Sequence, residues 1–357
     1  MNLRPLLQAT SREWRANLRR LFQRNHFILG EELRAFETEF AAALGGKYAV
    51  GVANGTSAIE LCLRDAGVTS GEVITSALTA PFSGVGIRAA GATPKFADID
   101  AETLQIDPDD AASRITSRTR ALMPVHLYGQ PCALDQFVKL ALKHKIPLIQ
   151  DAAQAHGARF DGKPLAAFSR YVAYSFYPTK NLGCMGDGGG IMIDDAATRD
   201  RIVVLRDGGR HGDQIAHSFG VNSRLDEMQC CFLRAFLPHL NDWNAHRARI
   251  ASIYDGELRG CAGVRLVKKT EGSVHHLYVI RAERRDQLRE HLAAQGIGTA
   301  VHYPVPLHRH PAFAQKGSLP IAEQAVTEII SLPLWPYFKE SAARRVARQI
   351  RKFYGRT

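Results

Sequence analysis

The chain has 357 residues, enough for two domains, and its 45% hydrophobic and 23% charged residues exclude a disordered, collagenous or coiled-coil protein. No stretch reaches the roughly 18 consecutive apolar residues of a membrane helix, and the N-terminus has no apolar signal core, so we expect a cytoplasmic protein without a membrane partner. The net charge of +11 suits either nucleic acid or a phosphorylated small molecule, but the basic residues match no nucleic-acid-reading motif, so we expect no nucleic-acid partner.

The segment from residue 45 to residue 193 alternates short β-rich runs with longer amphipathic runs. This alternation predicts an α/β fold with a doubly wound, mainly parallel sheet and helices on both faces. Crossover helices are predicted at Ala58–Ala66, Ser83–Ala90 and Leu134–His144. The seven predicted strands are Tyr48–Val52, Val73–Thr75, Lys95–Ala97, Ala121–Pro124, Pro147–Ile149, Val172–Phe176 and Gly190–Ile193.

The pattern changes after Gly220, where a long helical stretch runs over Leu225–Arg249 with a break or bend near Pro238. We therefore predict a large domain of residues 1–240, with an N-terminal helix, and a smaller α+β domain of residues 241–357. The elements expected in the second domain are a strand at His275–Arg281, a helix at Arg285–Gln295, a Pro-rich crossing at His302–Pro311 and a terminal helix at Ala342–Phe353.

The six cysteines show no CxxC spacing, and the adjacent pair Cys230-Cys231 is poorly placed to share a metal or a bridge. Reduced, structural thiols and no metal site are expected.

A first candidate site is Asn54-Gly55-Thr56-Ser57, which follows the first predicted strand and opens a helix. Backbone N–H groups and the hydroxyls of Thr56 and Ser57 converge there at the positive end of the helix dipole, where a phosphate binds. The same residue types cap helices, so simple capping is the open alternative. Without GxGxxG or a P-loop lysine, the segment does not indicate a dinucleotide or nucleoside triphosphate site.

A second candidate is Asp151, which ends the apolar run Pro147–Gln150 and precedes small alanines and Gln154. Ligands of open α/β sheets bind at strand ends. A carboxylate there can hold a protonated heterocyclic nitrogen, while Gln154 reaches another edge of the same flat ring. The alternative is an aspartate that caps a helix starting at Ala152.

The third candidate is Lys180 in Ser175–Gly183, again directly after a predicted strand and followed by the glycine-rich Gly186–Gly190. A Schiff-base lysine needs such a restricted, partly desolvated setting, because only the neutral amine is nucleophilic. Ser175 adds a further hydroxyl for a phosphate. Phosphate donors, a ring-nitrogen carboxylate and a Schiff-base lysine together predict a pyridoxal 5′-phosphate (PLP) site.

At these residues the chain resembles the DegT/DnrJ/EryC1/StrS family of fold type I sugar aminotransferases. The resemblance covers nearly the whole chain. Its motifs occur in the family's order at Phe27–Glu32, Tyr48–Ala58, His126–Gly129, Asp151–Gly157, Ser175–Gly183, Gly186–Gly189, Gly220–Gln229 and His302–His308.

The resemblance implies roles for the matching residues. Lys180 would form the internal aldimine and move the proton between substrate and cofactor, Asp151 would pair with the pyridinium nitrogen, and Gln154 would bond the phenolic oxygen. Gly55, Thr56 and Ser175 would hold the phosphate.

By the same resemblance, the asparagine that matches Asn222 comes from the partner subunit, which implies a homodimer with composite active sites. Taken alone, Asn222 also reads as a turn residue before the helix at Leu225.

The chain also departs from the family's pattern. Ala80 stands where the family has an aromatic residue that stacks on the cofactor ring, so either Phe82 takes over this contact or the loop Thr79–Ser83 is rearranged. The segment Gly71-Glu72-Val73 is one residue shorter than usual, and Gln150 replaces a glutamate beside Asp151.

The resulting function is a ping-pong amino transfer from an amino donor, by resemblance L-glutamate, to a keto-sugar on a nucleoside diphosphate. His302, Tyr303 and His308 are candidates for the diphosphate, with surface or packing roles as the alternative. Rival functions are a PLP-dependent sugar dehydratase or deoxygenase, disfavoured because the dehydratase branch has a histidine at the place of Lys180, and a non-catalytic binding or regulatory homologue.

Overall fold

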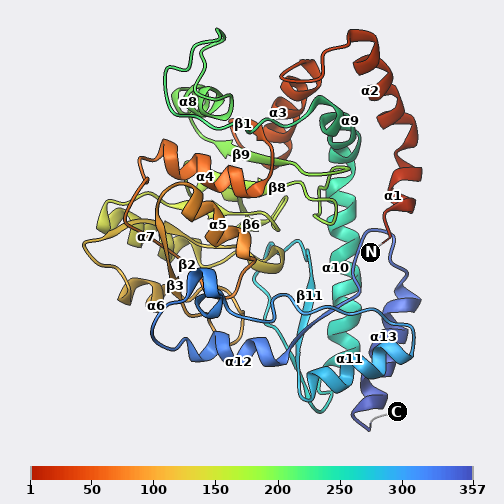
Figure 1. Ribbon diagram of the computed structural model, residues 1–357. Helices are drawn as coiled ribbons and strands as arrows, with labels where there is room; N and C mark the ends of the chain where they lie inside the picture. Colours follow the sequence, from red (N-terminus) through yellow and green to blue (C-terminus); the bar gives the residue numbers. More distant parts are fainter. Residues whose placement is uncertain (1, 356–357) are drawn as a thin grey trace.

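A seven-stranded sheet organises the computed structural model, which describes residues 2–355 (Figure 1). Four strands in the order β1-β9-β8-β5 adjoin three in the order β4-β2-β3, through parallel bridges from Leu122 to Leu148 and from Val125 to Asp151. All pairs are parallel except those of β9, which is antiparallel to both β1 and β8. The strands are β1 (Tyr48–Val52), β2 (Glu72–Ser76), β3 (Thr93–Ala97), β4 (Thr119–Met123), β5 (Ile149–Asp151), β8 (Tyr171–Ser175) and β9 (Gly189–Ile193).

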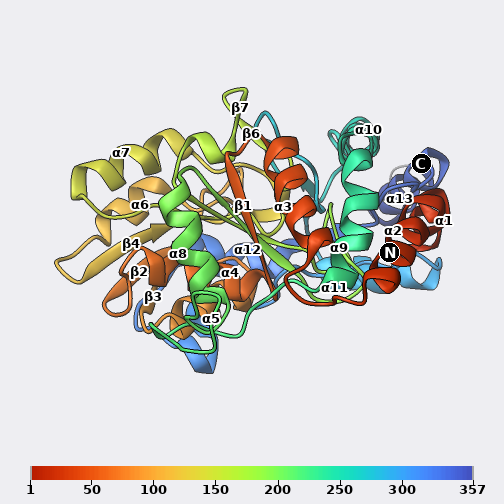
Figure 2. The ribbon, with the colours of Figure 1, turned by 90° about the horizontal axis from the view of Figure 1, so that it is seen from above.

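Helices cover both faces of this sheet, as predicted (Figure 2). Along β8, Val172 and Tyr174 pack into one apolar cluster while Tyr171 and Ala173 pack into another, which is the alternation expected of a strand buried on both faces. The first cluster includes α3 (Glu31–Leu44), α7 (Leu134–His144) and α9 (Glu227–Phe236), and the second includes α4 (Gly55–Asp65), α5 (Pro81–Ala89) and α8 (Ala196–Arg206).

The chain after residue 240 builds a second, antiparallel sheet in the order β10-β11-β12. The long α10 begins at Leu240 after a short 3₁₀ turn at Leu237–His239, where the sequence predicts a break near Pro238. The division of the chain at residue 240 stays a prediction. The elements are β10 (Val264–Leu266), β11 (Tyr278–Ala282), β12 (Ile329–Leu332), α10 (Leu240–Leu258), α11 (Arg285–Ala294), α12 (Pro320–Glu328) and α13 (Glu340–Phe353).

The remaining elements are short or peripheral. No helix among residues 2–355 is long and apolar enough to cross a membrane. These elements are α1 (Arg4–Ala9), α2 (Ser11–Arg24), α6 (Pro108–Ser113), β6 (Arg159–Phe160), β7 (Lys163–Pro164) and 3₁₀ turns at Leu127–Gly129, Leu165–Ala167, Leu307–Arg309 and Pro311–Phe313.

Helix α4 begins at Gly55, within the segment Asn54–Ser57 that was predicted to open a helix and three residues before the predicted run from Ala58. The Asn54 side chain caps it by accepting the Ser57 N–H at 2.9 Å. The alternative of a helix capped by Asp151 is wrong, since the chain from residue 152 to residue 158 forms turns.

A buried carboxylate joins α9 to the start of α3. Glu227 is 1% exposed and accepts the N–H groups of Gly30, Glu32 and Leu33 at 2.8–2.9 Å. A Cβ at Gly30 would lie 2.7 Å from Glu227 Oε2, so only glycine fits there. The carboxylate thus satisfies the free donors at the N-terminus of α3 and complements its dipole.

Glu227→Ala should lower the free energy of unfolding by about 2 kcal/mol or more, because it strands three donors in a buried place. Glu227→Gln keeps one acceptor oxygen and should lower the free energy of unfolding by less. Urea denaturation of both variants checks this. The control is Glu31→Gln, which changes an exposed glutamate in the turn of α3 that Glu227 caps. Equal stability of Glu227→Ala and wild type would contradict the capping role.

Candidate functional site

The three candidate segments around Gly55, Asp151 and Lys180 lie at the carboxyl ends of β1, β5 and β8. Lys180 follows β8 and interacts electrostatically with Asp151 at the end of β5. A Cβ at Gly55, after β1, would lie 2.8 Å from the Cβ of Ser175, at the end of β8. The sheet therefore brings together three segments that are up to 125 residues apart in sequence, from Gly55 to Lys180.

Asp151 is a buried carboxylate with two hydrogen bonds. Its Oδ2 accepts the Ser83 hydroxyl at 2.7 Å, and its Oδ1 accepts the backbone N–H of Ala153 at 3.1 Å. Burial raises the pKa of Asp151, while the Ser83 hydrogen bond, the Ala153 N–H and the charge of Lys180 oppose this rise. Ser83, on α5, is a contact that the sequence analysis missed.

Lys180 sits in a loop whose base is closed by backbone hydrogen bonds. Phe176 N–H donates to Gly188 O and Cys184 N–H to Phe176 O, both at 2.7 Å, and Lys180 N–H donates to Tyr177 O at 2.8 Å. Its amine has no hydrogen bond or ion pair within residues 2–355. Burial lowers the pKa of this amine to about 8, and the Asp151 carboxylate resists the change by stabilising the ammonium. The amine is thus unpaired and readily deprotonated.

The first turn of α4 forms a cradle of free donors. Within the described residues, the N–H groups of Gly55 and Thr56 have no acceptor, and Asn54 alone performs the side-chain capping. The hydroxyls of Thr56 and Ser57 are consequently not used for it. A side chain at Gly55 would collide with Ser175, so glycine keeps the cradle open beside a further hydroxyl.

Gln154 is fixed in orientation. Its Oε1 accepts the Tyr128 N–H at 2.7 Å, so its Nε2 must be the donor that reaches the Tyr303 hydroxyl at 3.0 Å. The Tyr128 hydroxyl in turn donates to the carbonyl of His302. Tyr128 lies in the predicted motif His126–Gly129, but sequence alone assigned it no role.

The other predicted residues are less closely engaged. Phe82 is 65% exposed, and His302 Nδ1 is bonded to Ser331 Oγ at 2.9 Å. His308 is buried and bonded to Glu323 at 2.8 Å, contacts that a packing role explains; its part in substrate binding stays a prediction. Asn222 is exposed and makes no side-chain hydrogen bond within the described residues.

These residues fit a phosphorylated pyridine aldehyde. The unpaired Lys180 amine suits an aldehyde, the Asp151 carboxylate suits a ring N–H, and the cradle at Gly55, which any Cβ would close, suits a phosphate. Ala80 ends the loop before α5 with a small side chain, so this loop offers no aromatic ring at that position. Within residues 2–355 there is no group of side chains that could hold a metal ion.

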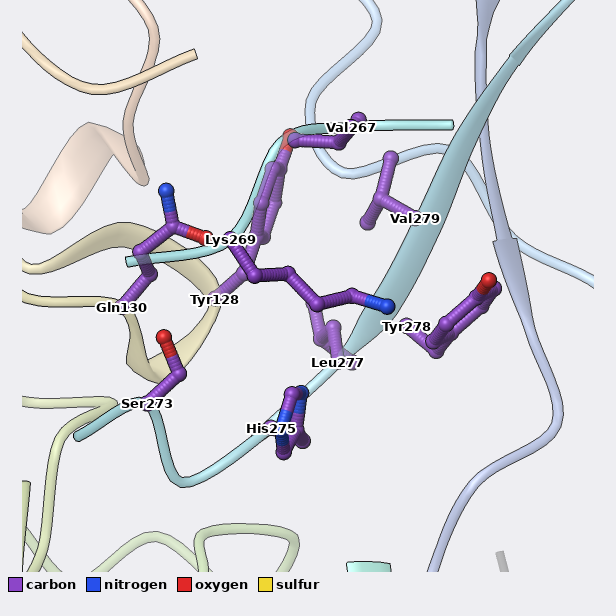
Figure 3. Close-up of a pocket in the computed structure, with 9 residues that line it drawn as sticks. All are labelled: Tyr128, Gln130, Val267, Lys269, Ser273, His275, Leu277, Tyr278 and Val279. Atoms are coloured by element: carbon purple, nitrogen blue, oxygen red, sulfur yellow. The ribbon is translucent and has the colours of Figure 1, made fainter. Parts of the chain in front are cut away.

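Tyr128 also lines a small pocket (Figure 3). Its volume of about 20 Å³ has room for one water. Lys269 extends along it toward Tyr278 and is paired with Asp255. The pocket shares only Tyr128 with the residues described above, so it is separate from the Lys180 site.

Comparisons with known proteins point to one family. The model of the DegT/DnrJ/EryC1/StrS aminotransferase family matches residues 8–351. The dTDP-3-amino-3,4,6-trideoxy-alpha-D-glucose transaminase of Streptomyces venezuelae is 41% identical over 360 residues, which cover 99% of this chain and 95% of that protein. A Geobacillus stearothermophilus protein named pleiotropic regulatory protein is 41% identical over 339 residues, covering 92% and 91%.

Among solved structures, S. venezuelae DesV in complex with a ketimine intermediate is 41% identical. Its TM-score is 0.97, with 100% of this chain and 98% of that chain covered. The predicted fold type I architecture is thereby confirmed.

Labelling of the apoprotein tests the state of Lys180. Trinitrobenzenesulfonate reacts with neutral amines, so Lys180 should be modified with a midpoint of about pH 8, whereas ordinary lysines titrate near about 10.4. Asp151→Asn should move the midpoint lower, because it removes the charge that stabilises the ammonium. Mass spectrometry of the labelled peptide measures both. A midpoint equal to that of the exposed lysines would contradict the desolvated setting.

Proposed function

The chain belongs to the DegT/DnrJ/EryC1/StrS aminotransferase family, and from this premise we propose that it transfers the amino group of L-glutamate to a keto-sugar carried on a nucleoside diphosphate. It is a PLP-dependent sugar transaminase. The observation that carries the proposal is the unpaired Lys180 amine beside Asp151 and the phosphate cradle at Gly55.

When bound, PLP supplies an electron sink and a carrier for the amino group. In this proposal Gly55, Thr56, Ser57 and Ser175 hold its phosphate through backbone N–H groups and hydroxyls. Asp151 holds the ring nitrogen in its protonated form, and Gln154 donates from Nε2 to the ring's phenolic oxygen.

Lys180 has two tasks. Its Nζ attaches the cofactor covalently, which requires the neutral amine that a pKa of about 8 makes available near neutral pH. The same Nζ would also move the proton between substrate carbon and cofactor. The donor and the acceptor would use this one site in turn, so we expect ping-pong kinetics.

The acceptor is proposed to be nucleotide-linked. The similar S. venezuelae protein is named for a dTDP-linked amino sugar, and the basic balance of this chain suits a diphosphate. Phe82, His302 and Tyr303 are proposed to contact this substrate: Tyr303 reaches the site through Gln154, and Phe82 is exposed at the start of α5.

We also propose a homodimer. Large apolar side chains are exposed, among them Tyr177 in the loop of Lys180, and Phe27 and Met228 on two segments that are joined by the bond from Glu227 N–H to Phe27 O. Asn222 ends the loop that projects beyond α8, on which Phe219 is 95% exposed (Figure 1). A second copy of the chain would cover these residues, and Asn222 would complete the phosphate site of that copy.

Visible spectra test the amino transfer. The protein loaded with PLP should lose its imine band on addition of L-glutamate, with release of 2-oxoglutarate, and a nucleotide-linked keto-sugar should restore the band while the free keto-sugar does not. Lys180→Ala should show no such conversion. A band that glutamate leaves unchanged would contradict the donor and would favour a dehydratase or a regulatory protein.

Mixed dimers test the shared site. Lys180→Ala and Asn222→Ala homodimers should each be impaired, and subunit exchange between them should restore activity, because one site of the mixed dimer has both its own Lys180 and the partner's intact asparagine. Each mixed dimer then has one working site in two. If Asn222 acted within its own chain, both sites would stay defective and mixing would restore nothing.

A further inference from the structure

Two hydroxyl groups connect the loop before α5 to Asp151. Thr79 Oγ1 lies 3.0 Å from Ser83 Oγ, and Ser83 Oγ lies 2.7 Å from Asp151 Oδ2. Thr79 and Ser83 are each 2% exposed and Asp151 is 3% exposed, so water does not compete for these contacts. The chain of hydrogen bonds reaches the carboxylate from the side of α5, while the backbone of Ala153 reaches its other oxygen.

The direction of both hydrogen bonds follows from the chemistry of the groups. An ionised carboxylate only accepts, so Ser83 donates its single proton to Asp151. Ser83 can then only accept from Thr79, whose hydroxyl must be the donor. Because each bond polarises the next, the pair donates more strongly to the carboxylate than one hydroxyl would.

The loop before α5 ends in Ala80, whose small side chain offers little surface to lay against a ring. The hydroxyls of Thr79 and Ser83 are therefore the main polar contribution of the loop to the site.

We propose that Ser83, supported by Thr79, is a positioning residue that keeps Asp151 ionised and fixes the direction of its carboxylate, so that Asp151 can hold a ring nitrogen in its protonated form. The proposal rests on the proposed function, because it needs a cofactor with such a nitrogen. The titratable groups that interact electrostatically with Asp151 are Lys180 and Tyr303. Neither donates a hydrogen bond to it, which leaves Ser83 as its one side-chain donor within the described residues.

The test uses the full-length protein loaded with PLP that carries ¹⁵N in its ring. The ¹⁵N chemical shift reports directly whether the ring nitrogen is protonated. In wild type it should stay protonated across the pH range of activity, and in Asp151→Asn it should not. Ser83→Ala should lose the proton at a lower pH than wild type and should lower kcat by about tenfold, the effect of one hydrogen bond to a charged group. Ser83→Thr, which keeps the hydroxyl, should restore both values.

Two further variants guard against a purely structural effect. Ser76→Ala removes a buried hydroxyl whose one hydrogen bond within residues 2–355 is to Leu78 O, and it should match wild type in shift and kcat. Thr79→Val keeps the volume and removes the second hydroxyl, so it should show a smaller loss of the ring proton than Ser83→Ala, and it remains informative if Ser83→Ala does not fold.

The outcomes separate this inference from the proposed function. A wild-type protein without PLP binding or transamination would refute the function itself. An active wild type with an unchanged ¹⁵N shift in Ser83→Ala, whether or not turnover falls, would overturn the role of Ser83. A shift that moves in Ser83→Ala and returns in Ser83→Thr supports it.

Discussion

The site depends on one buried carboxylate. Asp151 stands at the end of a central strand, where burial by itself favours the neutral acid. Three groups from different segments stabilise its ionised form: the Ser83 hydroxyl, the Ala153 N–H and the Lys180 amine. The same burial lowers the pKa of Lys180. The same desolvation therefore acts on both groups, because it raises the pKa of Asp151 and lowers that of Lys180.

The sheet was largely predictable because its strands are apolar on both faces. The predicted helix Leu134–His144 and the strand Tyr48–Val52 agree with the structure residue for residue. The strand predicted at Pro147–Ile149 is displaced to Ile149–Asp151, since apolar character marks the buried run but not where the ladder of hydrogen bonds begins. Asp151 and Lys180 could be predicted to lie near each other, because each is at or just after the carboxyl end of a strand of this sheet.

Contacts made through tertiary packing were not predictable in the same way. Ser83 is 68 residues from Asp151, and only the docking of α5 brings the two together. Glu227 belongs to the motif Gly220–Gln229, yet its side chain caps α3, nearly 200 residues earlier in the chain. A sequence shows that a serine or glutamate is present, but the partner of its side chain depends on how helices far apart in the chain come to pack.

The antiparallel strand β9 has a consequence for how the protein is made. It lies between β1 and β8 and pairs with both, so the strand that precedes Gly55 is joined to the strand that precedes Lys180 only after residue 193 has been synthesised. A nascent chain that ends shortly after Lys180 has every residue of the Asp151–Lys180 pair but no bridge to β1. The residues that pair between β1 and β9 are more than 130 positions apart in the sequence, and contacts over such a distance form late in folding. The turn at Gly55 and the loop of Lys180 are therefore joined through the sheet only once β9 has formed, so β9 sets the earliest stage of synthesis at which this part of the site is assembled.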